Sequence, residues 1–273
     1  MLKKKPIYWT IHDVDFRPTN SGIRGKLESL QVRLLCQNGW LATKVNAIIV
    51  HGAKLRDKLI SRGLSGSKVF VIPHFDYRYL LPLPSQSDIN NSYREYVLLF
   101  GKIKPYKGVE VLLDASRMVR KKVGIKFKVM IAGKGNVSYL NTLLTNNDLE
   151  YIHLRNGFIP DIEIPELFRN AKFLVLPYVD ASQSGVVSLA YTFSKPVIVS
   201  NVGSIAEYVD HGVTGLIFES GNARQLANYI EELIESSDRC IEMGKNAYEK
   251  MKREMSLEMC CHYLNELYNG YVK

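Results

Sequence analysis

Apolar and polar residues alternate along this chain in blocks typical of strands and helices that follow one another. Short apolar runs, many of them rich in Val, Ile and Leu, predict strands buried on both faces, as in a parallel sheet. Stretches with apolar residues three and four positions apart predict helices that cover such a sheet. Regular alternation of the two element types predicts an α/β fold with right-handed crossovers.

The pattern occurs twice, and the segment 80–92, rich in Pro, Ser and Asn, predicts a linker between the two series. The first series has strands at 7–12, 47–50 and 69–73 and helices over 26–40 and 54–62. The second has strands at 96–100, 127–132 and 151–154, helices over 109–122, 138–145 and 162–170, and three final helices over 223–235, 238–255 and 257–271. The second series is long enough for a complete Rossmann-like unit, whereas the first is abbreviated.

The segment 173–218 is the most informative part of the second series. The apolar run FLVLP ends in polar and small residues up to Gly185, which open a helix over 186–193. Ser182 or Ser184 is expected to cap that helix, and a helix N-terminus beside the carboxyl end of a strand favours an anion. The strand VIVS and the turn after it lead to the same edge, with Glu207 one helical turn later.

Two glycine-rich turns follow the first two strands of the second series. In GKIKPYKG, at 101–108, the glycines let the backbone approach a ligand, and Lys102 and Lys107 are expected to converge on a pyrophosphate. The alternative is a lysine-rich surface turn. In GKG, at 133–135, Lys134 belongs to a turn that is equally typical of a plain strand-to-helix connection.

Composition and charge exclude some classes of function and favour others. No run of about 18 apolar residues predicts a membrane span. The four cysteines have no spacing typical of zinc or of a disulfide framework. The net charge is +9, of which residues 1–95 carry +8. This basic first third favours an anionic partner, such as lipid headgroups or a phosphate-bearing acceptor. The alternative is that its basic residues are scattered over a solvated surface. Nucleic acid is not expected, because no aromatic-interleaved basic motif accompanies the charge.

The motifs GK-IKPYKG-VEVLLDA, VMIAGKG and KPVIVSNVGSIAEYVDHGVTGLIF resemble the nucleotide-binding half of retaining GT-B glycosyltransferases, in particular glycosyltransferase family 4 (group 1). The resemblance covers residues 96–220 and, less closely, 7–78. It implies an α/β, GT-B-like fold of two Rossmann-like units with parallel sheets, the N-terminal one abbreviated. The implied domains are an acceptor-side unit at 1–80, a linker at 81–95, a nucleotide-sugar-binding domain at 96–253 and a helix at 254–273 that packs back toward the first unit.

The resemblance also implies roles for individual residues. Lys102 and Lys107 hold the diphosphate, and His12 lies near the transferred sugar and the acceptor; these three are the expected catalytic residues. The expected donor-binding residues are Gly101, Lys134, Gln183, Ser184, Gly185 and Glu207. No metal ion and no cofactor is expected, and the donor is a UDP- or GDP-linked sugar.

The chain departs from the family pattern at several positions. Lys102 stands where an arginine is usual. The two usual glutamates fall on Ala181 and Leu189, whose side chains cannot accept a hydrogen bond from a ribose hydroxyl. Asp13-Val14-Asp15 mimics the metal motif of a different glycosyltransferase fold, which two Rossmann-like units argue against. His74 matches a family position, but Phe75 replaces the glycine expected after it, which favours an ordinary loop.

The expected function is transfer of a hexosyl group, with retention, from a nucleoside diphosphate sugar to a glycan or lipid-linked acceptor. Surface polysaccharide synthesis, such as capsule or lipopolysaccharide, is the expected setting, in the cytoplasm and peripheral to the inner face of the plasma membrane. The alternative is a non-catalytic nucleotide-sugar-binding subunit or pseudoenzyme. A second chain or a homodimer is expected to cover the incomplete first unit.

Overall fold

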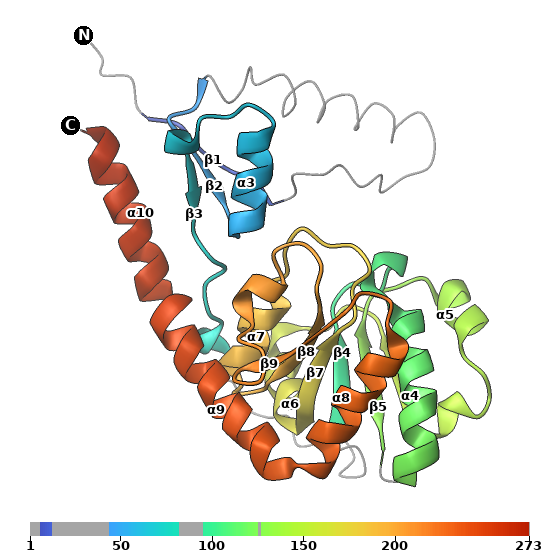
Figure 1. The fold of residues 1–273 in the computed structure, drawn as a ribbon. Helices are drawn as coiled ribbons and strands as arrows, with labels where there is room; N and C mark the ends of the chain where they lie inside the picture. Colours follow the sequence, from blue (N-terminus) through green and yellow to red (C-terminus); the bar gives the residue numbers. More distant parts are fainter. Residues whose placement is uncertain (1–5, 13–43, 82–94, 125–126, 273) are drawn as a thin grey trace, which may run out of the picture. The chain divides into compact units, whose positions relative to one another are not determined.

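The computed structural model describes residues 6–12, 44–81, 95–124 and 127–272. The chain divides into two compact units, one of Met1–His74 with Leu257–Lys273 and the other of Phe75–Ser256 (Figure 1). The helix expected over 26–40, most of the expected linker, and Asp13 and Asp15 lie outside the described residues.

The first unit contains a parallel sheet of β1 (Tyr8–Thr10), β2 (Ala47–Val50) and β3 (Val69–Val71), in that spatial order. Successive side chains of β2 point to opposite faces of the sheet, and both faces are buried. On one face, Ile48 and Val50 pack with Leu55 and Leu59 of α3 (Ala53–Ser61). The other face packs against α10 (Leu257–Val272), in a cluster of Ala47, Ile49, Ile72, Cys260 and Leu267.

The second unit contains six parallel strands in the order β6-β5-β4-β7-β8-β9. Their bounds are Tyr96–Phe100 (β4), Val129–Gly133 (β5), Ile152–Asn156 (β6), Ala171–Leu176 (β7), Val197–Ser200 (β8) and Gly215–Phe218 (β9). The helices are α4 (Val109–Val123), α5 (Val137–Leu143), α6 (Ile164–Asn170), α7 (Val186–Thr192), α8 (Ala223–Glu235) and α9 (Ser237–Glu254). The strands lie between these helices, so both faces of the sheet are covered (Figure 1).

Burial on both faces explains why these strands are apolar at nearly every position. In β4, Tyr96 and Leu98 belong to the core shared with α6, α7 and α9. The alternate residues Val97 and Leu99 belong to the core shared with α4 and α8. The predicted α/β class with parallel sheets is therefore confirmed, with three strands in the described part of the first unit and six in the second.

Several element bounds differ from those expected. β5 begins at Val129, α5 ends at Leu143, and α6 begins only at Ile164, because residues Asp161–Glu163 form a separate 3-10 turn before it. The segment 75–81 belongs to the second unit, where the carbonyl of Phe75 accepts a hydrogen bond from Ser188 and the N–H of Tyr77 donates to Thr192.

A buried carboxylate joins α4 to the segment before β6. Asp148 is 2% exposed and accepts hydrogen bonds from the guanidinium of Arg117 at 2.8 and 3.2 Å. It also accepts from the N–H and hydroxyl of Thr145 and from the hydroxyl of Tyr151. Burial alone would raise the pKa of Asp148, but these hydrogen bonds outweigh it and hold the pKa well below the ordinary 3.8.

Replacement of Asp148 by alanine is expected to lower the free energy of unfolding of the second unit by about 2–4 kcal/mol, since hydrogen bonds to a charged group contribute about 1.5–3 kcal/mol each. The depressed folded-state pKa means that this contribution is present above pH 3.8 and is lost as pH falls below that value. Urea unfolding of both proteins at neutral and acidic pH measures the difference. A difference independent of pH between neutrality and pH 3 would contradict this account.

None of the described helices is long and apolar enough to cross a membrane.

Candidate functional site

The carboxyl edge of the six-stranded sheet has a topological switch point between β4 and β7. From β4 the chain continues to β5 and β6 on one side, and from β7 it continues to β8 and β9 on the other. Ligands of open parallel sheets bind in the crevice at such a point. Residues 101–108 follow β4 and residues 177–185 follow β7. The strand order therefore places the candidate site between these two loops.

The two loops approach each other closely because Gly108 has no side chain. Its φ of 66° lies in the left-handed region, and a Cβ at this position would overlap the carbonyl oxygen of Pro177. The N–H of Val179 donates a hydrogen bond to the carbonyl of Tyr106, with 2.9 Å between nitrogen and oxygen. The backbone thus fixes the separation of the loops.

Lys107 joins the two loops through its ammonium group. The side chain is 7% exposed, and Nζ lies 3.9 Å from the centre of the Tyr178 ring and donates a hydrogen bond to the Tyr178 hydroxyl. The Tyr178 hydroxyl lies 3.3 Å from Oγ of Ser184. Nζ is also 3.8 Å from the position that a Cβ at Gly101 would occupy. A buried cation is therefore held at the switch point by an aromatic ring and a hydroxyl.

Tyr178 orients this group rather than carrying charge itself. Burial raises the pKa of Tyr178, and the hydrogen bond to Ser184 acts in the opposite direction to a smaller extent. The phenol therefore keeps its proton at neutral pH. Because its oxygen accepts from Lys107, its O–H is available to donate to Ser184.

The other predicted residues of the second unit lie at the same edge with different exposure. Lys107 and Ser184 both contact Tyr178, and Gly101 lies beside the ammonium of Lys107. Lys102, Lys134 and Glu207 are exposed, and Gln183 and Gly185 are partly buried. The convergence of Lys102 with Lys107 on one ligand therefore stays a prediction.

The start of α7 differs from the expected serine cap. The N-cap residue is Gly185, which has no side chain to accept a hydrogen bond from the first turn. Oγ of Ser184, one residue earlier, accepts a hydrogen bond from the N–H of Val186 at 3.3 Å. Ser182 instead uses its backbone, because its carbonyl accepts from the N–H of Ser204 and so links the loops after β7 and β8.

The positions where the family pattern has glutamates are apolar and buried. Ala181 is 6% exposed and Leu189 is 4% exposed, and both belong to the core on the α7 side of the sheet. A Cβ at Gly203, whose φ is 52°, would overlap the carbonyl oxygen of Ala181. The loop after β8 therefore packs against the position where one carboxylate is expected.

His12 belongs to the first unit, where it follows β1 and is exposed. Its Nδ1 lies 3.1 Å from Nε2 of His51, the residue after β2. Nδ1 of His51 lies 2.9 Å from the carbonyl oxygen of Ile72, and the ring of His74 is stacked on that of His51 with centres 4.1 Å apart. The described residues contain no group of three or more side chains arranged to hold a metal ion.

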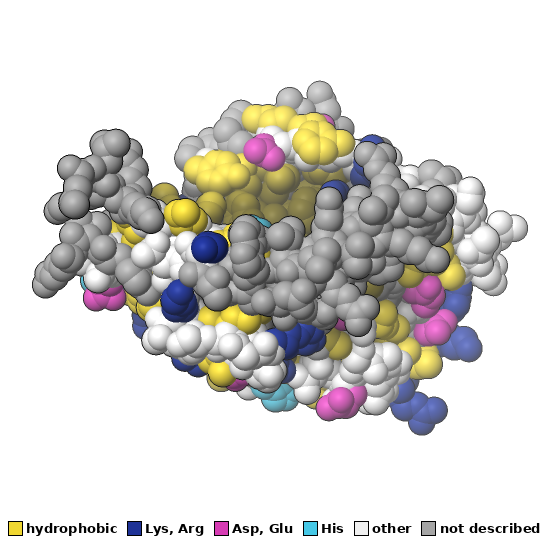
Figure 2. Space-filling view, turned by 90° about the horizontal axis from the view of Figure 1, so that it is seen from above, with side chains coloured by type: hydrophobic (Ala, Val, Ile, Leu, Met, Phe, Trp, Pro, Cys, Tyr) yellow, Lys and Arg dark blue, Asp and Glu magenta, His cyan; other side chains and the backbone are white. Residues whose placement is uncertain are grey.

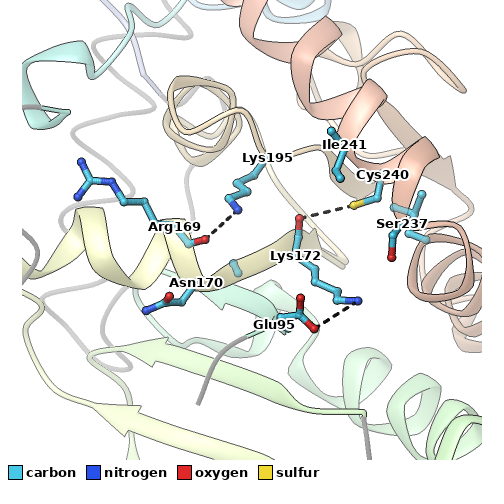
Figure 3. Close-up of a pocket in the computed structure, with 10 residues that line it drawn as sticks. Glu95, Arg169, Asn170, Lys172, Lys195, Ser237, Cys240 and Ile241 are labelled. Carbon is cyan, nitrogen blue, oxygen red and sulfur yellow. Dashed lines mark hydrogen bonds and ion pairs between the residues drawn. The ribbon is translucent and has the colours of Figure 1, made fainter. Parts of the chain in front are cut away.

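A pocket of about 280 Å³ lies at the opposite, amino edge of the second unit's sheet (Figure 3). Lys195, which precedes β8, donates a hydrogen bond to the carbonyl of Arg169, whose guanidinium points away from the pocket. Lys172 is paired with Glu95 at 3.8 Å. The pocket is thus remote from the strand ends that form the switch point, and its cations already have partners.

The described charges are mixed on the face that Figure 2 shows. Lysine and arginine side chains are spread over this face together with acidic ones, so its described part presents no single basic patch. Several basic residues of the first third, such as Lys3, Lys4 and Lys5, lie outside the described residues.

Sequence reasoning missed Tyr178 and His51 as members of these sites. Tyr178 follows directly after the FLVLP strand, and an aromatic residue at that place is a signal that the pattern does contain. His51 follows the AIIV strand in the same way. Parallel strands bring their carboxyl ends to one edge, and this rule could have grouped both residues with the predicted ones.

Known proteins with similar sequences are glycosyltransferases. The family model for glycosyl transferases group 1 matches residues 85–250. An uncharacterized glycosyltransferase of Methanocaldococcus jannaschii, MJ1178, is 32% identical over 171 residues, which are 63% of this chain and 47% of that protein. The capsular polysaccharide biosynthesis glycosyltransferase CapM of Staphylococcus aureus is 25% identical over 178 residues, 63% of this chain and 45% of CapM. The chain thus spans about half the length of these curated relatives.

Solved structures share the fold at lower identity. Anabaena Alr3699/HepE, solved in complex with UDP and glucose, matches with a TM-score of 0.75 at 20% identity, over 97% of this chain and 72% of HepE. S. aureus TarM matches with a TM-score of 0.77 at 19% identity, over 98% of this chain and 51% of TarM. The family model covers more than half of this chain, so the chain belongs to the group 1 glycosyl transferases. Its two α/β units, each built on a parallel sheet, have the GT-B fold.

Proposed function

We propose that this chain transfers a hexosyl group, with retention, from a UDP- or GDP-linked sugar to a glycan or lipid-linked acceptor, as a member of glycosyltransferase family 4. The proposed setting is the synthesis of a surface polysaccharide. The observation that carries the proposal is the buried ammonium of Lys107 at the switch point between β4 and β7.

A diphosphate leaving group gains negative charge as the bond between its oxygen and the anomeric carbon of the donor sugar breaks and the bond to the acceptor oxygen forms. A positive charge fixed in a site of low water content stabilises that developing charge without reorganisation. Lys107 fits this role because Tyr178 and the loop backbone hold it in place. Helix α4 begins at Val109, two residues after Lys107. Its first turn adds backbone N–H groups that have no partner within the helix, together with the positive end of the helix dipole.

The remaining residues supply the rest of the proposed donor site. Exposed Lys102 reaches the diphosphate from solvent, and Ser184, with Gln183 and Gly185, forms the opposite wall. The exposed carboxylate of Glu207 accepts hydrogen bonds from hydroxyls of the donor sugar. No side-chain nucleophile is assigned, and His12 of the first unit lies near the transferred sugar.

The names of the relatives support the same substrate class. CapM is named for capsular polysaccharide biosynthesis, and AmsK of Erwinia amylovora for amylovoran biosynthesis. HepE has been solved with UDP-glucose. A nucleoside diphosphate sugar and a glycan acceptor are therefore the substrates that we propose for this chain.

Thermal unfolding of the full chain with UDP, GDP and their sugars tests the donor site. A ligand at 100 times its Kd adds about 2.7 kcal/mol to the stability of the folded state. We expect one of the two diphosphates to raise the unfolding temperature by roughly 5–10 °C. The matching monophosphate, which lacks the β-phosphate, is the control and should shift it far less. Equal shifts with mono- and diphosphate, or no shift with any nucleotide, would contradict the proposed site.

A further inference from the structure

Each of the three strands in the first unit's sheet is followed within three residues by a histidine. His12 follows β1, His51 follows β2 and His74 follows β3. The strands are parallel and adjacent, so these residues meet at one edge. The rings lie 19° to 34° from parallel, with the centres of His12 and His51 4.8 Å apart. The described residues contain no group of three or more side chains that could hold a metal ion at this edge.

The hydrogen bonds fix which nitrogen carries each proton. The carbonyl oxygen of Ile72 can only accept, so Nδ1 of His51, 2.9 Å away, carries a hydrogen. In neutral His51, Nε2 therefore has a lone pair and accepts. Its partner at 3.1 Å is Nδ1 of His12, which must then be the donor. It follows that neutral His12 has its hydrogen on Nδ1 and a lone pair on Nε2.

His51 is suited to this role because burial favours its neutral form and its contacts hold the ring in one orientation. The side chain is 8% exposed, and burial lowers its pKa, a direction that the nearby His12 reinforces and the hydrogen bond to Ile72 opposes. The ring of His74 stacks on His51 at an interplanar angle of 24°. Both ring nitrogens of His51 are thereby held toward their partners.

We propose that His51 is a positioning residue, which fixes the tautomer of His12 and turns Nε2 of this exposed side chain into a hydrogen-bond acceptor for a hydroxyl group. An isolated neutral imidazole side chain favours the opposite tautomer, with the hydrogen on Nε2. Without His51, His12 would therefore present a donor at this position, which suits a phosphate oxygen or a carbonyl instead. The pair selects a hydroxyl-bearing ligand at the edge of the first unit.

The tautomer of His12 does not depend on the proposed function. Only the source of the hydroxyl rests on that function, and we assign it to the sugar or the acceptor. Among the described residues, no hydrogen bond to Nε2 of His12 competes for that position. The tautomer itself is a property of the chain without ligand, so it can be measured without any assay of transfer.

Nitrogen NMR of the full chain labelled with 15N-histidine reports the tautomer directly, and only six histidines contribute to the spectrum. A His12→Gln variant assigns the signals of His12. At a pH where His12 is neutral, we expect its Nδ1 to be protonated and its Nε2 to be bare. A wild-type spectrum with the hydrogen on Nε2 of His12 would overturn the proposal.

Two variants of His51 separate positioning from packing. His51→Phe keeps a stacked ring but has no acceptor, so His12 is expected to change to the tautomer with its hydrogen on Nε2. In His51→Gln, the amide N–H can donate to Ile72 and the amide oxygen can accept from His12, so the wild-type tautomer should return. An unchanged tautomer in His51→Phe would overturn the role of His51. The matched control is His262→Gln, which changes an exposed histidine of α10 and should leave His12 unaffected.

The same variants are then assayed for transfer. His51→Phe should lower kcat roughly three- to tenfold, the range expected for one hydrogen bond, with KM for the donor unchanged. Nucleotide binding to the second unit is measured separately by thermal unfolding. A correct tautomer with no nucleotide binding would refute the proposed transfer and leave the histidine pair in place. Normal binding and transfer with the wrong tautomer would refute the pair alone.

Discussion

Replacing Lys107 by alanine is expected to weaken binding of the nucleoside diphosphate by about ten- to a hundredfold. A hydrogen bond between an ammonium and an ionised phosphate contributes about 1.5–3 kcal/mol, and each 1.4 kcal/mol is a factor of ten in Kd. Lys107 is the buried cation at the switch point, so its charge is poorly screened by solvent. Titration calorimetry with UDP and GDP measures the loss.

Alanine also removes the buried stem of the side chain, so a second variant separates charge from packing. Lys107→Met keeps an unbranched apolar chain against Tyr178 but has no ammonium. Burying an ammonium costs free energy that burying an apolar side chain of similar length does not. We therefore expect Lys107→Met to lose as much affinity as Lys107→Ala without a fall in the free energy of unfolding.

The matched control for both variants is Lys121→Ala, which removes an exposed lysine from the last turn of α4. It should bind the diphosphate as the wild type does. Wild-type affinity in Lys107→Met would remove Lys107 from the site. A loss of affinity that occurs only together with a loss of stability would make its role structural.

Much of the fold follows from the sequence because its apolar runs are short and end sharply. The bounds expected for β2, β4 and β8 match the structure at both ends, since each is a run of apolar residues that is buried on both faces. Less regular stretches gave bounds that were wrong by one or two residues. The start of α6 is one of them, because acidic residues form a 3-10 turn before Pro165.

The site was harder to predict because its contacts depend on the spatial order of the strands. Local pattern identifies the loop after β4 and the loop after β7, but not that these two strands are neighbours. Lys107 and Tyr178 are 71 positions apart in the chain, so their hydrogen bond follows only from that order. The same holds for His12 and His51. His74 was expected to be an ordinary loop residue, yet its ring is stacked on that of His51.

Gly108→Ala is expected to lower the free energy of unfolding of the second unit by about 3–5 kcal/mol. Part of this loss, about 1–2 kcal/mol, comes from the left-handed backbone that a residue with a Cβ disfavours. The rest arises because the new Cβ would overlap the carbonyl oxygen of Pro177 and force the loops after β4 and β7 apart. Urea unfolding of the full chain measures the total.

Gly212→Ala isolates the first contribution. Gly212 also has a positive φ, 81°, but no atom lies within 4 Å of the position that its Cβ would take. Its loss should therefore stay near 1–2 kcal/mol, the backbone contribution alone, and it should leave nucleotide binding intact. Gly108→Ala should in addition weaken binding, because the shift of the loop after β4 moves Lys107 away from Tyr178. Equal losses of stability in the two variants would contradict the close approach of Gly108 to Pro177. The loops after β4 and β7 would then be farther apart than the structure shows, and Lys107 would not be confined between them.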